Sequence, residues 1–151
     1  MKKPSPGYKS KTLATWIALL GGSLGLHRFY LFGFSDWLGW LHPGPTLLGI
    51  VGVQRMLELG QDDRLSWLLI PLLGLMLSQS MLTGIVWGLM PDERWNAHFN
   101  PEGPQHRTGW ANVMGVILSL MIGAGILMAT IAFGMQRYFE VQVEEARKIS
   151  Q

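Results

Sequence analysis

The chain has 151 residues, a length typical of one domain. Charged residues make up only 15% of the chain and hydrophobic residues make up 48%. This composition excludes a disordered chain, which needs low hydrophobicity, and the absence of cysteine excludes a disulfide-stapled scaffold. The net charge of +2, with no clustered array of basic residues, gives no reason to expect nucleic-acid binding. The sequence therefore predicts an all-α integral membrane protein.

Four apolar stretches follow one another along the chain, and each is a candidate transmembrane helix. A bilayer core about 30 Å thick needs roughly 20 apolar residues in a helix, and unpaired backbone groups are too costly there for other structures. The stretches are 12–33, 37–53, 67–90 and 109–134. We expect the second helix to be short and kinked, because it holds Pro43 and Pro45, or else to be a re-entrant hairpin.

The polar segments between these stretches complete the predicted organisation. It comprises a basic tail at 1–11, a helical hairpin at 12–54, a loop at 55–66, a second hairpin at 67–135 with a loop at 91–109, and a charged tail at 136–151 that prolongs the last helix. Four spans would place both tails and the loop 55–66 on one side of the membrane, together with most of the Lys and Arg residues. The positive-inside rule then predicts cytoplasmic N- and C-termini.

Residue spacing on the predicted helices indicates how they pack. Small residues recur every four positions in Ala14–Ala18–Gly22, Ser80–Gly84–Gly88 and Gly115–Ser119–Gly123. Such stripes let helix backbones approach closely, and we expect contacts within the chain, with a dimer interface as the alternative. Methionines recur every seven residues at Met114, Met121, Met128 and Met135, as in heptad packing on one helix face. Gln79, a polar residue in mid-span, is expected to form a hydrogen bond to a neighbouring helix.

The most distinctive motif is the segment 21–33, which reads GGSLGLHRFYLFG and follows Lys9-Ser10-Lys11. Over residues 9–54 the chain resembles the TM2-domain family, small membrane modules of two helices joined by a short turn. The whole chain resembles bacterial membrane proteins that add two further helices to this module. The sequence departs from the family pattern in an extra residue at Leu31-Phe32-Gly33, in the prolines of the second helix, and in Gln54-Arg55 where the family often has an acid. The resemblance implies a fold and a multi-pass location in the bacterial inner membrane, but no agreed activity.

Nine residues of this segment form the candidate contact site: Gly21, Gly22, Gly25, His27, Arg28, Phe29, Tyr30, Gly33 and Asp36. Arg28 lies near a predicted helix end and must reach water or a partner, because a charge in hydrocarbon is costly. Asp36 is the nearest acid in sequence, so we expect an Arg28–Asp36 ion pair that closes the turn, with Phe29 and Tyr30 at the membrane interface. The pair is either a folding staple only or part of a surface that docks a partner protein or lipid headgroups.

No residue pattern points to catalysis, a metal or a cofactor. The chain has no cysteine, no nucleophile elbow, no phosphate-binding loop and no acid in the middle of a predicted span. His27 and His42 are only loosely placed to hold a haem, and His98 and His106 are expected in a solvated loop. We therefore expect a non-enzymatic multi-pass protein that acts through protein or lipid contacts as a scaffold, assembly factor or regulatory subunit, with a membrane-protein partner or as a homo-oligomer. The alternative is a small oligomeric transport or channel subunit.

Overall fold

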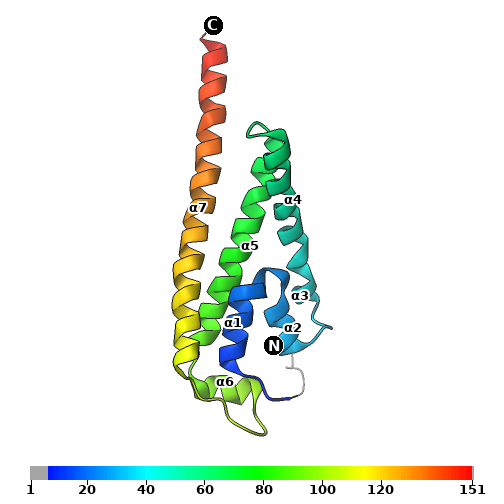
Figure 1. Cartoon of the computed structure of the whole chain (residues 1–151), viewed down its shortest axis with the longest axis vertical. Helices are drawn as coiled ribbons and strands as arrows, with labels where there is room; N and C mark the ends of the chain where they lie inside the picture. The colour runs from blue at the N-terminus through cyan, green and yellow to red at the C-terminus, as the bar shows by residue number, and fades with distance from the viewer. Residues whose placement is uncertain (1–6, 151) are drawn as a thin grey trace.

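A computed structural model describes residues 7–150, and all regular structure in that range is helical, as predicted. The elements are α1 (Lys11–Gly21), the 3-10 turn η1 (Gly22–Leu24), α2 (Leu26–Phe32), α3 (Trp37–Leu41), α4 (Pro43–Leu59), α5 (Arg64–Gly88), α6 (Asp92–Phe99) and α7 (Trp110–Ile149). Helices α5 and α7 pack against each other, α4 packs along α5, and α1 packs against both α5 and α7 (Figure 1).

Two helices in the described range, α5 and α7, are long and apolar enough to cross a membrane. They have 25 and 40 residues, and only 22% and 11% of their most apolar windows are buried inside the protein. A core helix of a soluble protein buries most of such a window, whereas a helix surrounded by lipid does not need to. The third and fourth predicted spans are therefore supported by length, composition and exposure.

The first apolar stretch, 12–33, does not form the single span that was predicted. Helix α1 has only 11 residues, about 16 Å at 1.5 Å per residue, which is half of a bilayer core. At Gly25 the backbone adopts φ +79°, and α2 then returns alongside α1. The return brings Tyr30 back to the start of α1, where its Oη accepts a hydrogen bond of 2.8 Å from the Ser10 N–H. Residues 11–32 are thus a hairpin of two short helices.

The second apolar stretch forms two consecutive helices that end at Leu59, beyond the predicted boundary at Val53. His42 has helical dihedral angles, so α3 and α4 follow each other almost without interruption from Trp37 to Leu59. Pro43 occupies the first position of α4, where a helix needs no amide donor, and the break between α3 and α4 at His42 lies directly before it. The stretch is not a re-entrant hairpin, and the turn that follows it covers 60–63 rather than 55–66.

Helix α4 packs on α5 rather than pairing with α1. At Gly52 a Cβ would lie 2.6 Å from the Leu69 Cβ, and at Gly49 it would collide with Leu73, so the two helices meet at backbone distance. The segment 12–54 is therefore not a hairpin of two spans, because α1 and α2 in its first half pack on each other and α4 in its second half packs on α5.

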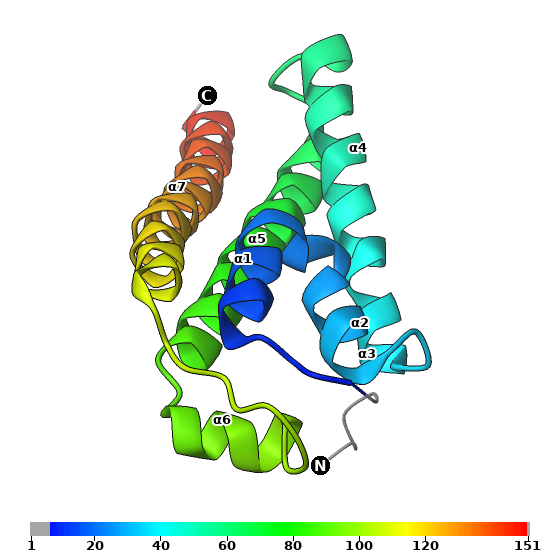
Figure 2. The same cartoon turned by 60° about the horizontal axis from the view of Figure 1, so that its bottom comes forward.

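The N-terminal segment and the loop 91–109 lie at the same end of the molecule, where α6 crosses beneath the bundle (Figure 2). The Lys9 N–H donates to Asn100 Oδ1 at 2.7 Å, and Trp95 Nε1 donates to the Lys9 carbonyl at 3.0 Å. The C-terminal end of α7 lies at the opposite end (Figure 1). Two predictions are therefore wrong. From Tyr8 onward, the N-terminal segment lies at the same end of the molecule as the loop 91–109, not on the opposite side (Figure 2). The two ends of the described chain lie at opposite ends of the molecule, not on one side (Figure 1). Residues 1–6 lie outside the described range.

The small-residue stripes pack within the chain, as expected. A Cβ at Gly84 would lie 3.2 Å from that of Ala18, and one at Gly115 would lie 3.0 Å from Thr15 Cγ2. The prediction for Gln79 is wrong, because its Nε2 donates at 3.3 Å to Thr83 Oγ1 on its own helix. The tail from Gln136 continues α7 as predicted.

Gly25→Ala should destabilise the protein by at least about 1–2 kcal/mol, the cost of a left-handed conformation for an L-residue. A further cost arises because the new methyl group would collide with the Gly39 carbonyl oxygen. Thermal unfolding in detergent measures the effect. Gly44→Ala is the matched control, because a Cβ at Gly44 meets no atom within 4 Å and Gly44 has no positive φ. Equal melting temperatures for the two variants would contradict the importance of this turn.

Candidate functional site

An ion pair lies at the centre of the predicted contact site. Arg28 Nε lies 2.6 Å from Asp36 Oδ2, and the Asp36 side chain is 1% exposed. The Arg28 guanidinium also lies 5.3 Å from the centroid of the Phe32 ring. Because Asp36 immediately precedes α3, the pair connects α2 to the start of α3 and closes the turn between them. The predicted Arg28–Asp36 pair is confirmed.

The glycines of the motif allow close packing around this pair. Gly33 ends α2 with φ +78°, and its N–H donates to the Phe29 carbonyl at 2.9 Å. A Cβ at Gly22 would lie 2.6 Å from the Ser80 Cβ on α5, and one at Gly21 would lie 2.5 Å from Leu26 Cδ1. The motif therefore determines both the fold of the α1–α2 hairpin and its packing against α5.

Phe29 and Tyr30 hold the hairpin from two sides. Phe29 packs towards α3, with ring-centroid distances of 5.3 Å to Phe34 and 5.1 Å to Trp40. Tyr30 packs towards the N-terminal segment, where Lys9 Nζ lies 4.9 Å from the centroid of its ring. These two residues were predicted to anchor a turn at the membrane interface; in the structure they contact protein, and the hairpin is held by its neighbours.

The structure brings His27 and His42 together, as the haem alternative required, but in a packed aromatic cluster. The buried His27 ring lies edge-on to the rings of His42 and Trp87, at centroid distances of 5.3 and 5.2 Å. Among residues 7–150, no group of three or more His, Cys, Asp or Glu side chains is arranged to hold a metal ion.

A second polar cluster was not predicted, and we call it the N-terminal clamp: Lys9, Lys11, Asp92, Trp95, Asn96, Asn100, His106 and Thr108. Lys11 is 2% exposed, and its Nζ lies 2.5 Å from Asp92 Oδ1 and 2.7 Å from the Met90 carbonyl. Asp92 also accepts a hydrogen bond of 2.8 Å from the Thr108 N–H. Burial raises the pKa of the Asp92 carboxyl, but the hydrogen bonds from Lys11 and Thr108 outweigh burial and hold that pKa at about 2. The Asp92 carboxyl is therefore ionised at neutral pH.

Two asparagines complete the clamp. Asn96 pairs with the backbone of His106 through bonds of 2.9 and 2.8 Å, and Asn100 Nδ2 donates to the Lys9 carbonyl at 3.0 Å. One signal in the sequence could have revealed α6: Pro91-Asp92-Glu93 is a typical helix start. No local pattern could have revealed the partners, because Lys9 and Asn100 are 91 residues apart.

Two hollows accompany these clusters. The first, which we call the interfacial hollow, has a volume of about 400 Å³ and lies where α2, α5 and α6 meet. Its lining residues are Phe32, Trp87, Met90, Arg94, Ala97, His98 and Phe99. It combines aromatic and aliphatic walls with one guanidinium and one imidazole, which suits an amphiphilic molecule or an amphiphilic segment of a partner.

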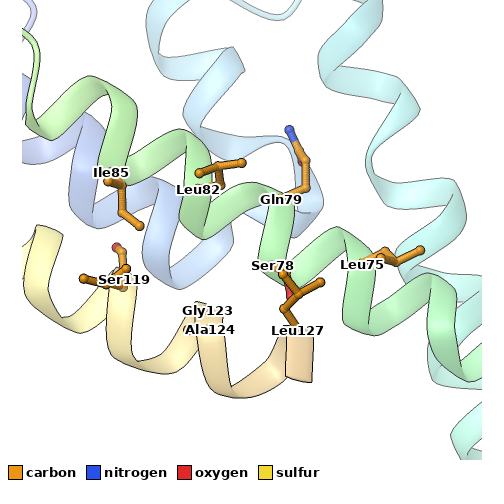
Figure 3. A pocket seen from close by; sticks show the side chains of 10 residues that line it. Leu75, Ser78, Gln79, Leu82, Ile85, Ser119, Gly123, Ala124 and Leu127 are labelled. Atoms are coloured by element: carbon orange, nitrogen blue, oxygen red, sulfur yellow. The ribbon is translucent and has the colours of Figure 1, made fainter. Parts of the chain in front are cut away.

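The second hollow is a groove of about 360 Å³ between α5 and α7 (Figure 3). Leucine side chains line it, and the Gln79 amide extends away from α7. Ser78 Oγ already donates to the Gly74 carbonyl at 2.8 Å, while Ser119 Oγ is buried with no hydrogen-bond partner in the described part of the chain. The groove offers an apolar surface of the kind that lipid chains cover.

No family model, curated protein or solved structure matches this chain. The resemblance of residues 9–54 to the TM2-domain family therefore stays a prediction. The roles described above for the motif residues rest on their contacts alone.

Arg28→Ala should destabilise the protein by about 3–5 kcal/mol, because it removes the guanidinium that pairs with the buried Asp36 carboxylate. The amount of folded, monodisperse protein and the melting temperature in detergent measure this loss. Arg64→Ala is the control, since Arg64 is exposed and has no ion pair in the described range. Wild-type yield and melting temperature for Arg28→Ala would show that the pair is not a staple.

The N-terminal clamp should weaken on mild acidification. Burial lowers the pKa of His106 below its ordinary value near 6.5, although the nearby Asp92 charge partly opposes the shift. The folded state thus binds its proton less readily than the unfolded state, so the stability contributed by neutral His106 is complete above about pH 6.5 and is lost as the pH falls below it. The melting temperature should drop between pH 7.5 and 5.5, and His106→Gln should reduce that drop. A His98→Gln control should retain the wild-type drop, and an unchanged drop in His106→Gln would contradict this role.

Proposed function

We propose that the chain is a multi-pass protein of a bacterial inner membrane, of the TM2-domain type, that acts through protein or lipid contacts as a scaffold, assembly factor or regulatory subunit and catalyses no reaction. In this proposal α3–α4, α5 and α7 cross the membrane, and the α1–α2 hairpin enters it from one side and returns. In this proposal the end that holds the N-terminal clamp is cytoplasmic.

The observation that supports a contact role is the interfacial hollow. The motif hairpin forms one wall of this hollow through Phe32. The charged side chains of the motif form an ion pair with each other, Arg28 with Asp36. Arg94, by contrast, is exposed at the hollow and has no ion pair in the described range. An aromatic hollow with an available guanidinium fits an acidic headgroup or an acidic side chain of a partner.

Purification in a gentle detergent, followed by mass spectrometry of bound lipids and proteins, tests this function. We expect a specific anionic lipid or a membrane-protein partner to accompany the wild type. Arg94→Ala should lower its retention about tenfold, since a hydrogen bond to a charged group contributes about 1.5–3 kcal/mol. Arg107→Ala, which removes an exposed loop arginine outside the hollow, should leave it unchanged. Equal retention by both variants, or a wild type without bound partner, would contradict the proposal.

One observation favours the alternative, a small transport or channel subunit. Gln79 is an exposed polar side chain on a helix that is otherwise strongly apolar, and Thr83 lies beside it. In an oligomer these groups could face a central path, which predicts ion or solute flux in liposomes that Gln79→Leu abolishes. The contact role predicts no flux.

A further inference from the structure

Two basic side chains of α6 line the interfacial hollow together. Arg94 and His98 are four residues apart, so they lie on the same face of the helix, and the small Ala97 lies beside them. On another face of α6, Trp95 and Asn96 are buried in the N-terminal clamp. The clamp therefore fixes the rotation of α6 that turns Arg94 and His98 towards the hollow.

Neither of these side chains has a polar partner in the described part of the chain. Arg94 is exposed and forms no ion pair there. His98 packs edge-on against the Phe99 ring, at a centroid distance of 4.6 Å, and its ring nitrogens form no hydrogen bond within residues 7–150. The donors of one guanidinium and one imidazole are thus free to hold a bound group.

The charges around the hollow select an anion. No carboxylate is among the residues that line it in the described range. The two acids of α6, Asp92 and Glu93, line a different hollow, and Asp92 is paired with Lys11. An anionic group in the interfacial hollow would therefore meet the Arg94 charge without repulsion from a lining carboxylate.

In the proposed membrane arrangement, the hollow lies where hydrocarbon meets the lipid headgroups. Trp87 and Met90 of its lining are at the C-terminal end of the apolar helix α5. Trp37 at the start of α3 and Trp110 at the start of α7 are 65% and 81% exposed, and both helices start towards the end of the molecule that holds α6 (Figure 1). Exposed tryptophans are typical of this boundary, where one side of the ring is apolar and the other is wet.

We propose that the interfacial hollow binds an anionic phospholipid, with its phosphate between Arg94 and His98 and its glycerol and upper acyl chain against Phe32, Trp87 and Met90. The guanidinium fork matches two phosphate oxygens, and the imidazole donates to a third. A phospholipid joins negative charge to apolar chains at the depth of this hollow, whereas soluble phosphate would leave the aromatic walls uncovered. The volume of about 400 Å³ is within the range of roughly 300–1,000 Å³ found for small-molecule sites. This inference rests on the proposed function, because it needs membrane insertion and names the ligand of the same hollow.

Native mass spectrometry of the delipidated full chain in detergent tests this assignment, with dioleoylphosphatidylglycerol as the probe. We expect a one-to-one complex. Arg94→Ala should weaken it about tenfold, and Arg94→Lys at least about threefold, because lysine keeps the charge but lacks the fork. His98→Ala should also weaken it, by about threefold. Arg107→Ala and Arg107→Lys are the matched controls, since Arg107 is equally exposed, so all four arginine variants should fold, and lies outside the hollow. No complex with the wild type, or equal affinities of the Arg94 and Arg107 variants, would overturn the proposal.

Three competitors at the same concentration distinguish the chemistry of the ligand. Dioleoylphosphatidylcholine has the same chains and phosphate but no net charge, glycerol 3-phosphate has the phosphate without chains, and oleate has a carboxylate on one chain. None of them should displace the bound lipid, and displacement by any one would overturn the assignment to an anionic phospholipid.

The same variants separate this inference from the proposed function. A membrane protein that accompanies the wild type and is lost in Arg94→Ala, without any binding of phosphatidylglycerol, would contradict only the lipid assignment. A wild type that holds neither a lipid nor a protein would contradict both.

Discussion

The arrangement depends on the break in the first apolar stretch. A left-handed glycine cannot continue a helix, and backbone that leaves the helix inside a membrane must be buried in protein. Gly25 imposes the break, and α3 and α5 provide the burial: a Cβ at Gly25 would meet Gly39, and one at Gly22 would meet Ser80. Because α1 then returns through α2, the first apolar stretch forms no single long helix, and the two ends of the described chain lie at opposite ends of the molecule (Figure 1).

The polar contacts of α1 explain why it can stop halfway. Thr15 Oγ1 donates to Asn112 Oδ1 at 3.2 Å, and Asn112 Nδ2 donates to the Gly88 carbonyl at 2.8 Å. This buried chain of hydrogen bonds joins α1, α5 and α7 just inside the N-terminal clamp. Lys11 and Asp92 close the same end with a charged pair. A short helix that could not span a membrane alone is thereby fixed at one end by polar bonds and along its length by small residues.

Sequence patterns predicted the local features well. The helical class, the long spans α5 and α7, the intrachain use of the glycine stripes and the Arg28–Asp36 pair all follow from spacing or from nearest neighbours in sequence. The N-terminal clamp and the hairpin could not be predicted in this way. An apolar run of 22 residues has the same composition whether it crosses or returns, and the decision depends on the φ of Gly25 and on partners such as Asn100, far along the chain.

The orientation error has the same origin. Counting basic residues on alternate loops assumes the number of crossings, so one span fewer would exchange the sides of every segment after it. The motif itself now has a clear structural role: its glycines, Arg28 and Phe29 build the hairpin and one wall of the interfacial hollow. This combination links folding to the surface through which we propose that the protein acts.

The most direct test of the account is the sidedness of the two termini. Fusions of a fluorescent reporter that matures only in the cytoplasm, placed separately before Met1 and after Gln151, should give a signal for the N-terminal fusion alone. A phosphatase reporter that is active only outside should give the reverse pattern. Both termini on the same side would show that the first stretch crosses the membrane and would contradict the α1–α2 hairpin.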